Sequence, residues 1–238
     1  MFDPTVPVQP QQIQTHVAEM NSFEISYDKV LLVLQQLDES SSPGPDGIHP
    51  IFLKRCAVLV AEPLAIIFRK TLSSGTLSSG TLPTEWKVSE VFALFKKGKK
   101  SDPLNYRPVS LTSVCCKVME RMIQHHVMTY INQNSLLSDK QFGFRAGRST
   151  EDQLLLAYAD VIDSVDRGDS IDMVYLEFSK AFDQVSHGVL LTKLGRLGFS
   201  QQILNWIASF LTDRRMCVSV RGCRSRVVEV LSGVPQGS

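Results

Sequence analysis

The chain has 238 residues, of which 43% are hydrophobic and 21% are charged, and its net charge is +1. This composition is typical of a globular protein with one large domain or two small ones. No apolar run reaches the ~18 residues of a membrane span, no signal peptide is present, and five cysteines without a CxxC pair argue against a disulfide framework or zinc module. We therefore expect an intracellular protein, nuclear or cytoplasmic, that does not enter a membrane.

The charges are distributed unevenly along the chain. Residues 1–50 carry a net charge of −6, residues 151–238 carry −2, and residues 51–150 carry +9, with 15 Lys and Arg against 6 Asp and Glu. A basic middle third attracts phosphates. It is equally compatible with a solvated basic surface that binds nothing.

Residues 1–22 are rich in proline and glutamine, which predicts an extended or poorly ordered lead-in. A helix is expected from Ser26, a suitable N-cap, to about Asp38. The serines, prolines and glycines of residues 40–47 then predict a shaped loop.

Two prolines indicate the next helices, because a proline in the first helical turn has no amide hydrogen to lose. Pro50 predicts the start of one helix and Pro63 the start of a second, which ends at Gly75. The sequence T-L-S-S-G at 71–75 is repeated at 76–80. We interpret this repeat as a local duplication in a surface loop.

The middle of the chain predicts one strand and two helices. The strand covers residues 88–95 and ends in the basic run at 96–100, and an amphipathic helix follows from about Val114 to Asn132. Residues 141–148 form a loop with two aromatic, two glycine and two arginine residues. Ser149 with Asp152 then makes a capping-box-like start for a helix to about Asp166.

Residues 171–178 predict a strand in which Ile171, Met173, Tyr175 and Glu177 share one face and Val174, Leu176 and Phe178 share the other, and the β-branched and aromatic side chains favour that state. Glu177 is the exception, because a carboxylate is costly to bury unless it is paired or binds a cation. Glu177 is therefore either a functional carboxylate or a plain strand end that points into water. Beyond it we expect helices near 187–196 and 201–212, and a hairpin of strands 215–221 and 226–231 connected through Gly222.

Five stretches of the chain occur in the order found in a known family. Together they resemble the reverse transcriptase of non-long-terminal-repeat retrotransposons, and most closely the jockey-like elements of animals. The stretches read SPGPDGI, FKKGKKSDPLNYRPVSLTSV, LLSDKQFGFRAGRST, VYLEFSKAFDQVSH and SGVPQGS. The resemblance covers roughly residues 24–238.

The resemblance implies an α+β fold, the fingers and partial palm of a right-hand polymerase. Residues 1–22 would be the lead-in, residues 23–170 a largely helical fingers-like region, and residues 171–238 the partial palm. We expect this fold to be truncated before the family's catalytic Asp-Asp hairpin and thumb. Strand 171–178 would then be central in the palm sheet and would have an exposed edge that promotes aggregation.

The resemblance also assigns roles to individual residues. It implies that Glu177 stands where the family has a catalytic aspartate that binds Mg²⁺. The partners it implies are an RNA template, a DNA primer and deoxynucleotide triphosphates. The nucleotide would be bound by Lys96 and Arg107 at its triphosphate, by Phe182 as a steric gate at the sugar, and by Gln236 and Gly237. Nucleic acid would contact Phe142, Gly143, Arg145 and Arg148.

Two departures from the family limit this function. Glutamate at 177 has one methylene more than aspartate, which displaces the carboxylate by about an ångström, and the sequence contains no Asp-Asp dipeptide. We therefore expect a reverse transcriptase fragment that is inactive on its own. Two alternatives stay open: a non-catalytic module that binds RNA or DNA, with Phe144 among its stacking residues, or a relic without function.

Overall fold

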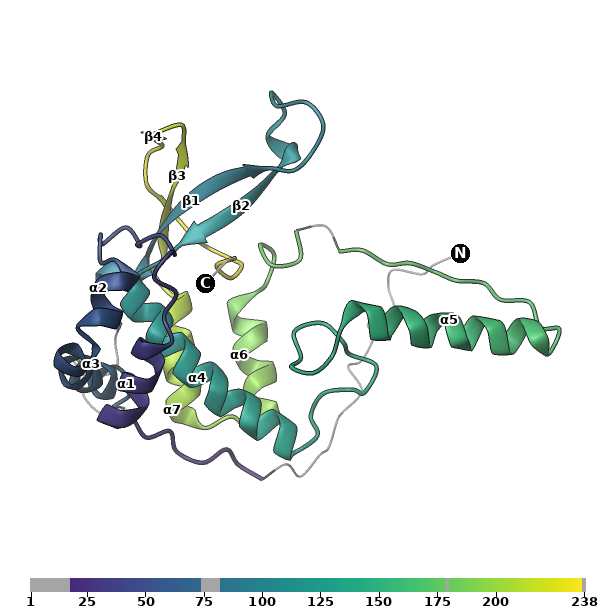
Figure 1. Cartoon of the computed structure of the whole chain (residues 1–238), viewed down its shortest axis with the longest axis horizontal. Helices are drawn as coiled ribbons and strands as arrows, with labels where there is room; N and C mark the ends of the chain where they lie inside the picture. Colours follow the sequence, from purple (N-terminus) through teal and green to yellow (C-terminus); the bar gives the residue numbers. More distant parts are fainter. Residues whose placement is uncertain (1–17, 74–81, 179, 237–238) are drawn as a thin grey trace.

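The computed structural model describes residues 18–73, 82–178 and 180–236, which form a helical body with a protruding sheet and a separate long helix (Figure 1). The fold is mixed α and β, as the sequence predicts. In chain order its described elements are α1 (Tyr27–Gln35), α2 (Pro50–Arg55), α3 (Ala57–Leu72), β1 (Val88–Phe95), β2 (Tyr106–Leu111), α4 (Val114–Gln133), α5 (Thr150–Asp166), α6 (His187–Arg196), α7 (Gln201–Leu211), β3 (Arg215–Val220), β4 (Cys223–Arg224) and β5 (Val228–Glu229).

The core lies between the amphipathic helices α1, α3, α4 and α7. Each buries its apolar stripe against the others, as helical spacing of apolar residues requires. Its most buried side chains include Leu34, Phe68, Met119 and Ile203. The described end of the lead-in also packs here, because Met20 is buried and its backbone N–H donates to the Gly198 carbonyl at 2.8 Å.

The predicted caps are confirmed. The side chains of Ser26 and Ser149 accept hydrogen bonds from the backbone amides three residues later, at 3.3 and 3.0 Å, and Pro50 is the first residue of α2. Pro63 was predicted wrongly, since it lies inside α3. Its exposed ring costs α3 one internal hydrogen bond, and the buried side chains of the same helix offset that cost. The predicted helix end at Gly75 and the T-L-S-S-G repeat lie outside the described residues, apart from the first residues of the repeat.

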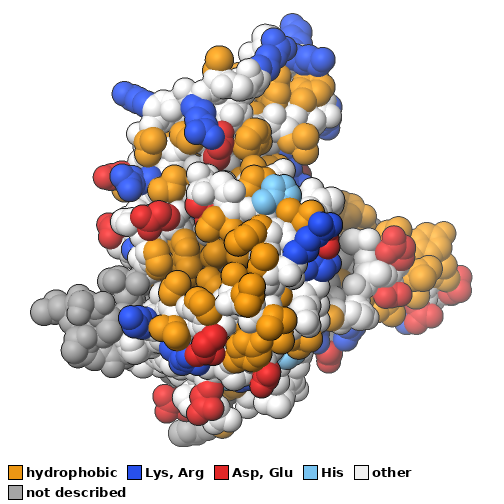
Figure 2. All heavy atoms as spheres, turned by 60° about the vertical axis from the view of Figure 1, so that its left-hand side comes forward, with side chains coloured by type: hydrophobic (Ala, Val, Ile, Leu, Met, Phe, Trp, Pro, Cys, Tyr) orange, Lys and Arg blue, Asp and Glu red, His pale blue; other side chains and the backbone are white. Residues whose placement is uncertain are grey.

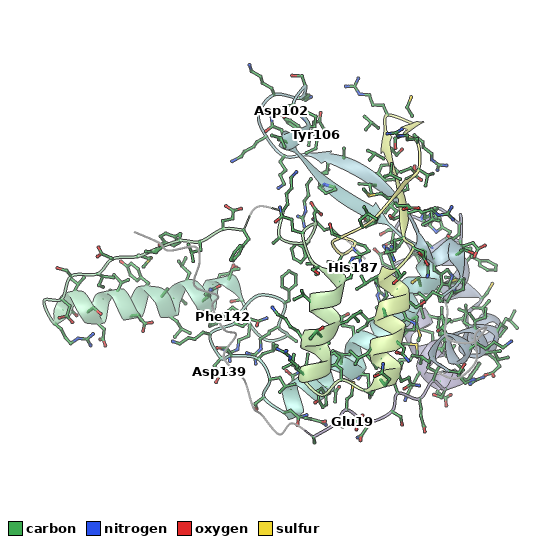
Figure 3. The ribbon with its side chains drawn as sticks, turned by 180° about the vertical axis from the view of Figure 1, so that it is seen from behind. Glu19, Asp102, Tyr106, Asp139, Phe142 and His187 are labelled. Carbon is green, nitrogen blue, oxygen red and sulfur yellow. The ribbon has the colours of Figure 1, made fainter. Side chains whose placement is uncertain are left out.

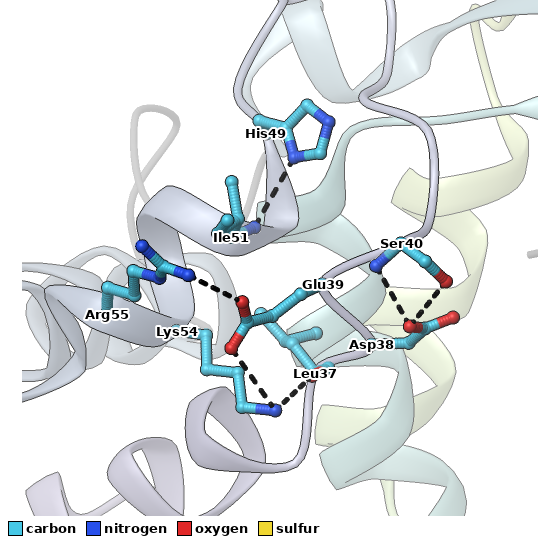
Figure 4. A network of polar contacts seen from close by, with 8 residues as sticks. All are labelled: Leu37, Asp38, Glu39, Ser40, His49, Ile51, Lys54 and Arg55. Carbon is cyan, nitrogen blue, oxygen red and sulfur yellow. Dashed lines mark hydrogen bonds and ion pairs between the residues drawn. The ribbon is translucent and has the colours of Figure 1, made fainter.

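The serine-, proline- and glycine-rich loop before α2 is shaped, as predicted (Figure 4). Asp38 accepts from the amide and hydroxyl of Ser40 at 2.9 and 2.7 Å, and these bonds lower the pKa of its carboxyl. Glu39 forms ion pairs with Lys54 and Arg55 of α2. Gly44 approaches the Thr112 carbonyl so closely that a Cβ there would collide with it. The loop is therefore attached both to α2 and to the segment that enters α4.

The sheet combines strands from distant parts of the chain. Its order is β2-β1-β3-β4, with β5 also paired to β3; β1 is antiparallel to β2 and parallel to β3. The predicted C-terminal hairpin is confirmed in part, since Arg221 and Gly222 have positive φ angles of 51° and 81°, as a tight turn requires. Its second strand is divided into β4 and β5 at Ser225, whose side chain and backbone both bond to Val218.

The prediction of a strand at 171–178 is wrong. This described segment connects α5 to the turn before α6 and pairs with no described strand. A strand is stabilised mainly by its cross-strand neighbours. Here β1 already has β2 on one side and β3 on the other, so the segment is not central in the sheet. Helix α5, although predicted correctly in its limits, has no buried residue among its described side chains.

Apolar side chains are also exposed on the side of the helical body that faces away from α5 (Figure 2). They gather over α2 and α3, where Ile48, Phe52, Leu53, Val60 and Leu64 line a shallow apolar groove. Among the described residues, no helix combines the length and apolar character that a membrane span needs.

Candidate functional site

The β1–β2 hairpin presents two of the predicted nucleotide-binding cations on one face. Leu94 pairs with Arg107, and the Lys96 amide donates to the Asn105 carbonyl at 2.8 Å, directly after β1. Because side chains alternate along a strand and paired residues share a face, Lys96 and Arg107 lie diagonally on the same face. Both are exposed to solvent. The sheet thus provides a rigid support for two neighbouring positive charges.

The basic turn at the end of this hairpin is held by side chains at its base. Asn105 donates through Nδ2 to the Lys99 carbonyl at 2.9 Å, and the Tyr106 hydroxyl donates to the Lys100 carbonyl at 2.8 Å. Figure 3 shows Asp102 and Tyr106 at the far end of the hairpin, away from Phe142 and Asp139. The predicted cations therefore come from a projecting element with a defined conformation.

A second part of the site is formed where the last described loop meets the turn before α6. The amides of Gly233 and Val234 donate to the carbonyls of Val185 and Phe182, both at 2.9 Å, and His187 Nε2 lies 2.8 Å from the Gly233 carbonyl. A Cβ at Gly233 would be 2.7 Å from the backbone of Asp183. Glycine is therefore needed at 233 for this close approach.

Gln236 connects this loop to the sheet. Its side-chain Nε2 donates to Asp183 Oδ1 at 3.0 Å, and its backbone carbonyl accepts from the Ser110 amide of β2 at 2.8 Å. The structure thus brings Phe182, Gln236 and the strand of Arg107 together, although 129 positions separate Arg107 from Gln236. Sequence reasoning missed Asp183, which accepts the hydrogen bond from Gln236. The only sequence feature that could have pointed to it is that it directly follows Phe182. Gly237 lies outside the described residues.

Phe182 is half-exposed, and one more aromatic ring stands beside it. Its ring centroid is 6.0 Å from that of Phe144, at an interplanar angle of 79°. Phe144 is 89% exposed and has a positive φ of 61°, which is unusual for a bulky side chain. The loop at 141–148 therefore presents an open ring next to the predicted steric gate.

The other predicted contacts in that loop have different surroundings. Phe142 is buried, and the guanidinium of Arg148 lies 5.1 Å from its ring centroid. Arg145 donates to the Ser138 carbonyl at 2.9 Å, and Arg148 forms an ion pair with Asp139. Gly143 has open space around it. These contacts hold the loop together and leave Phe144 as its exposed ring.

Glu177 stands apart from these clusters. It is exposed within the unpaired segment 171–178, and among the described residues it has no hydrogen-bond or ion-pair partner. Magnesium takes six oxygen ligands in near-octahedral geometry. The described residues hold no group of three or more His, Cys, Asp or Glu side chains that could bind a metal ion. The described residues therefore do not fit the Mg²⁺ that the resemblance implies.

Sequence reasoning also missed a bidentate ion pair on the sheet. Arg224 of β4 donates through Nε and Nη2 to the two carboxylate oxygens of Glu90 in β1, at 2.9 and 2.8 Å. The hydrogen bonds that Arg224 donates to Glu90 raise the pKa of the Arg224 guanidinium. Glu90 is buried while the Arg224 side chain is 66% exposed. No local pattern predicts a pair between residues 134 positions apart.

A family model and the most similar known proteins point to the same family. A family model described as reverse transcriptase (RNA-dependent DNA polymerase) matches residues 96–238. The chain is 31% identical to the "Probable RNA-directed DNA polymerase from transposon BS" and 30% identical to the "RNA-directed DNA polymerase from mobile element jockey", both of Drosophila melanogaster. Each match covers 90% of this chain and 23% of the relative, so the chain spans about a quarter of the length of these relatives.

Proposed function

The chain belongs to the reverse transcriptase family of non-long-terminal-repeat retrotransposons. On this premise we propose that it is the part of an RNA-directed DNA polymerase that binds the incoming deoxynucleotide. The observation that carries the proposal is the double contact of Gln236, with Asp183 on one side and Ser110 on the other. It joins the residue after Phe182 to the strand of Arg107. We assign residues 23–170 to the fingers and 171–238 to part of the palm, after the lead-in 1–22.

The proposed division of work follows from the chemistry of the side chains. Lys96 and Arg107 present positive charge from one face of a rigid hairpin, and a guanidinium can donate two parallel hydrogen bonds to one phosphate. Phe182, whose ring is half-exposed, would in this proposal crowd a ribose 2′-hydroxyl. An RNA template and a DNA primer are the macromolecular partners in this proposal, and the words RNA-directed DNA polymerase in the names of the relatives support the RNA template.

Primer extension needs more than nucleotide binding. Phosphoryl transfer requires cations on the phosphates and in-line geometry, which metal ions usually supply in polymerases. The 238-residue sequence contains no Asp-Asp dipeptide, and Glu177 is a longer and isolated carboxylate. We therefore propose that these 238 residues do not extend a primer by themselves. The comparisons do not favour the alternatives, which are a non-catalytic module that binds RNA or DNA and a relic without function.

Binding of a fluorescent deoxynucleotide triphosphate to the 238-residue chain tests the nucleotide site. Lys96→Ala and Arg107→Ala should each weaken binding about tenfold, because each removes a charge-assisted contact with phosphate. Lys70→Ala on α3 removes the same charge far from the hairpin and should leave affinity unchanged. Equal affinity in all four proteins would contradict the proposal.

Template-directed primer extension, with Mg²⁺ and with Mn²⁺, tests the proposal that these 238 residues do not extend a primer by themselves. We expect no incorporation by the 238-residue chain in either metal. Clear incorporation of a complementary deoxynucleotide would overturn the proposed inactivity while leaving the nucleotide site intact.

A further inference from the structure

Helix α5 presents an apolar stripe that the described part of the chain does not bury. Leu154, Tyr158, Ile162 and Val165 recur at helical spacing, and their exposed fractions lie between 45% and 71%. No described side chain of α5 is buried. A helix in a protein is stabilised mainly by burying its apolar face against a partner. The stripe therefore indicates a contact that the described residues do not supply.

The same helix is strongly acidic. Its 17 residues include five carboxylates and no Lys or Arg. Asp163 and Asp166, on the Ile162 edge of the stripe, repel each other across one turn and lie at the negative end of the helix dipole. Among the described residues, only Asp163 of these five carboxylates forms an ion pair, with Arg167 at 3.5 Å. A positively charged partner surface would relieve this repulsion.

The β1–β2 hairpin carries a complementary surface. We call it the hairpin face and define it by the residues that share one face of the two strands, which are Phe92, Leu94, Lys96, Arg107 and Val109. Phe92 is 41% exposed and Leu94 is 59% exposed. Residues 91–109 have a net charge of +4, with five Lys and Arg against one Asp. None of the ion pairs in the described part of the chain uses any of these five cations.

The lengths and directions of the two surfaces fit a contact between two copies of the chain. Helix α5 has 17 residues and is about 25 Å long, and the eight residues of β1 span about 26 Å. In Figure 1 the hairpin and α5 extend from the helical body in different directions, so the two surfaces of one chain do not meet. Each chain thus offers an acidic apolar helix and a basic apolar face of similar length.

We propose that two copies of this chain form a dimer in which α5 of each copy docks on the hairpin face of the other. The apolar stripe covers Phe92 and Leu94, and the carboxylates at the end of α5 approach Lys96 and Arg107. Two reciprocal contacts about a twofold axis use both surfaces of both copies, whereas a single contact leaves one surface of each kind open to further chains. Charge favours this pairing over contact between two α5 helices, because those repel each other.

Complementary charge reversals test the contact. Asp163→Lys with Asp166→Lys reverses the end of the helix, and Lys96→Glu with Arg107→Glu reverses the face. Sedimentation velocity over a range of concentrations should show a dimer for the wild type. Each double variant should raise its dissociation constant about tenfold or more, because like charges then face each other. In an equimolar mixture of the two variants every contact again joins opposite charges, so a heterodimer should form with nearly wild-type affinity.

Controls separate this effect from unfolding and from general charge. Lysine is favourable at the C-terminal end of a helix, so the α5 variant should keep its circular dichroism spectrum. Tyr158→Ser, an exposed change in the stripe, should weaken the dimer without altering any charge. Glu24→Lys with Glu85→Lys reverses two exposed carboxylates elsewhere and should leave the dimer unchanged.

Two results would overturn the proposal. One is a wild-type chain that stays monomeric at all concentrations, which would leave both surfaces to partners other than a second copy. The other is a mixture of the two double variants that stays monomeric, because opposite charges would then fail to restore the contact.

The dimer does not depend on nucleotide binding, but it covers Lys96 and Arg107. With the nucleotide site proposed above, a fluorescent deoxynucleotide triphosphate should bind the α5 double variant at every chain concentration and bind the wild type less as the dimer forms. A wild-type dimer that binds the deoxynucleotide as tightly as the monomer would overturn docking on this face. A monomeric α5 variant that binds no deoxynucleotide would instead remove the nucleotide site alone.

Discussion

Two adjacent cysteines at the start of α4 show how burial changes the pKa of a side chain. Cys115 and Cys116 are both buried among apolar residues. Burial disfavours the thiolate and raises the pKa of Cys115 from 9.0 to about 11, and burial likewise raises the pKa of Cys116. Arg214 is almost fully buried nearby, and burial lowers the pKa of its guanidinium. Both thiols should therefore stay protonated in the folded protein at neutral pH.

The free energy of unfolding should fall as the pH rises from about 9 to about 11. The folded state binds the Cys115 proton more tightly than the unfolded state does, so this stability is complete below the unfolded pKa near 9.0 and is lost as the pH rises through about 11. The loss from Cys115 should be at most about 3 kcal/mol, from a shift of about two pKa units. Urea unfolding of wild type and Cys115→Ala across this range isolates it, because other alkaline groups, Lys117 among them, titrate in both proteins. Parallel pH profiles would contradict the prediction.

Helices of similar amphipathic pattern have very different roles in this molecule. Helix α1 buries Val30 and Leu34 against α3 and α4, whereas α5 leaves Leu154, Leu155 and Tyr158 exposed. Both helices are capped by a serine. Their difference is therefore one of packing partners and not of helix propensity.

Two leucine substitutions should separate packed from unpacked helices. Leu34→Ala in α1 should lower the free energy of unfolding by about 3 kcal/mol, because it leaves a cavity in the core. Leu155→Ala in α5 should change it by less than about 0.5 kcal/mol, because that side chain is already in water. Urea unfolding at neutral pH measures both. A large loss for Leu155→Ala would show that α5 packs against the core in solution.

At the scale of the whole molecule, the exposed apolar side chains of α5 and of residues 171–178 dominate one end. Val174, Leu176 and Phe178 are each exposed by more than three quarters. The sequence predicts aggregation through an exposed sheet edge at residues 171–178. In the structure this segment is not part of the sheet, and its exposed apolar side chains are the surface that would associate. Contiguous exposed apolar surface of this kind promotes association.

The 238-residue chain should self-associate as its concentration rises. Leu176→Lys should shift sedimentation-velocity profiles toward the monomer, because it places a charge within the exposed apolar segment. Leu104→Lys, an equally drastic change at an exposed leucine beside the hairpin turn, serves as the matched control and should not do so. A single monomeric species for the wild-type chain at all concentrations would contradict this.

The sequence by itself determined the local structure and the family. Helical spacing of apolar residues predicted α1 and α4, serine caps predicted where α1 and α5 begin, and the strand predicted at 88–95 matches β1 over its full length. Five ordered motifs predicted the reverse transcriptase family. These features depend on residues close together in the chain, so they are readable without a three-dimensional structure.

Only the tertiary structure decided which segments become partners. It placed Pro63 inside a helix, paired β1 with β3, left residues 171–178 without a described partner strand, joined Glu90 to Arg224, and brought Gln236 to Ser110. Each of these outcomes depends on contacts between residues far apart in sequence. The strand predicted at 88–95 therefore formed, because neighbours on both sides satisfy its backbone, whereas the strand predicted at 171–178 did not form, because no described strand pairs with it.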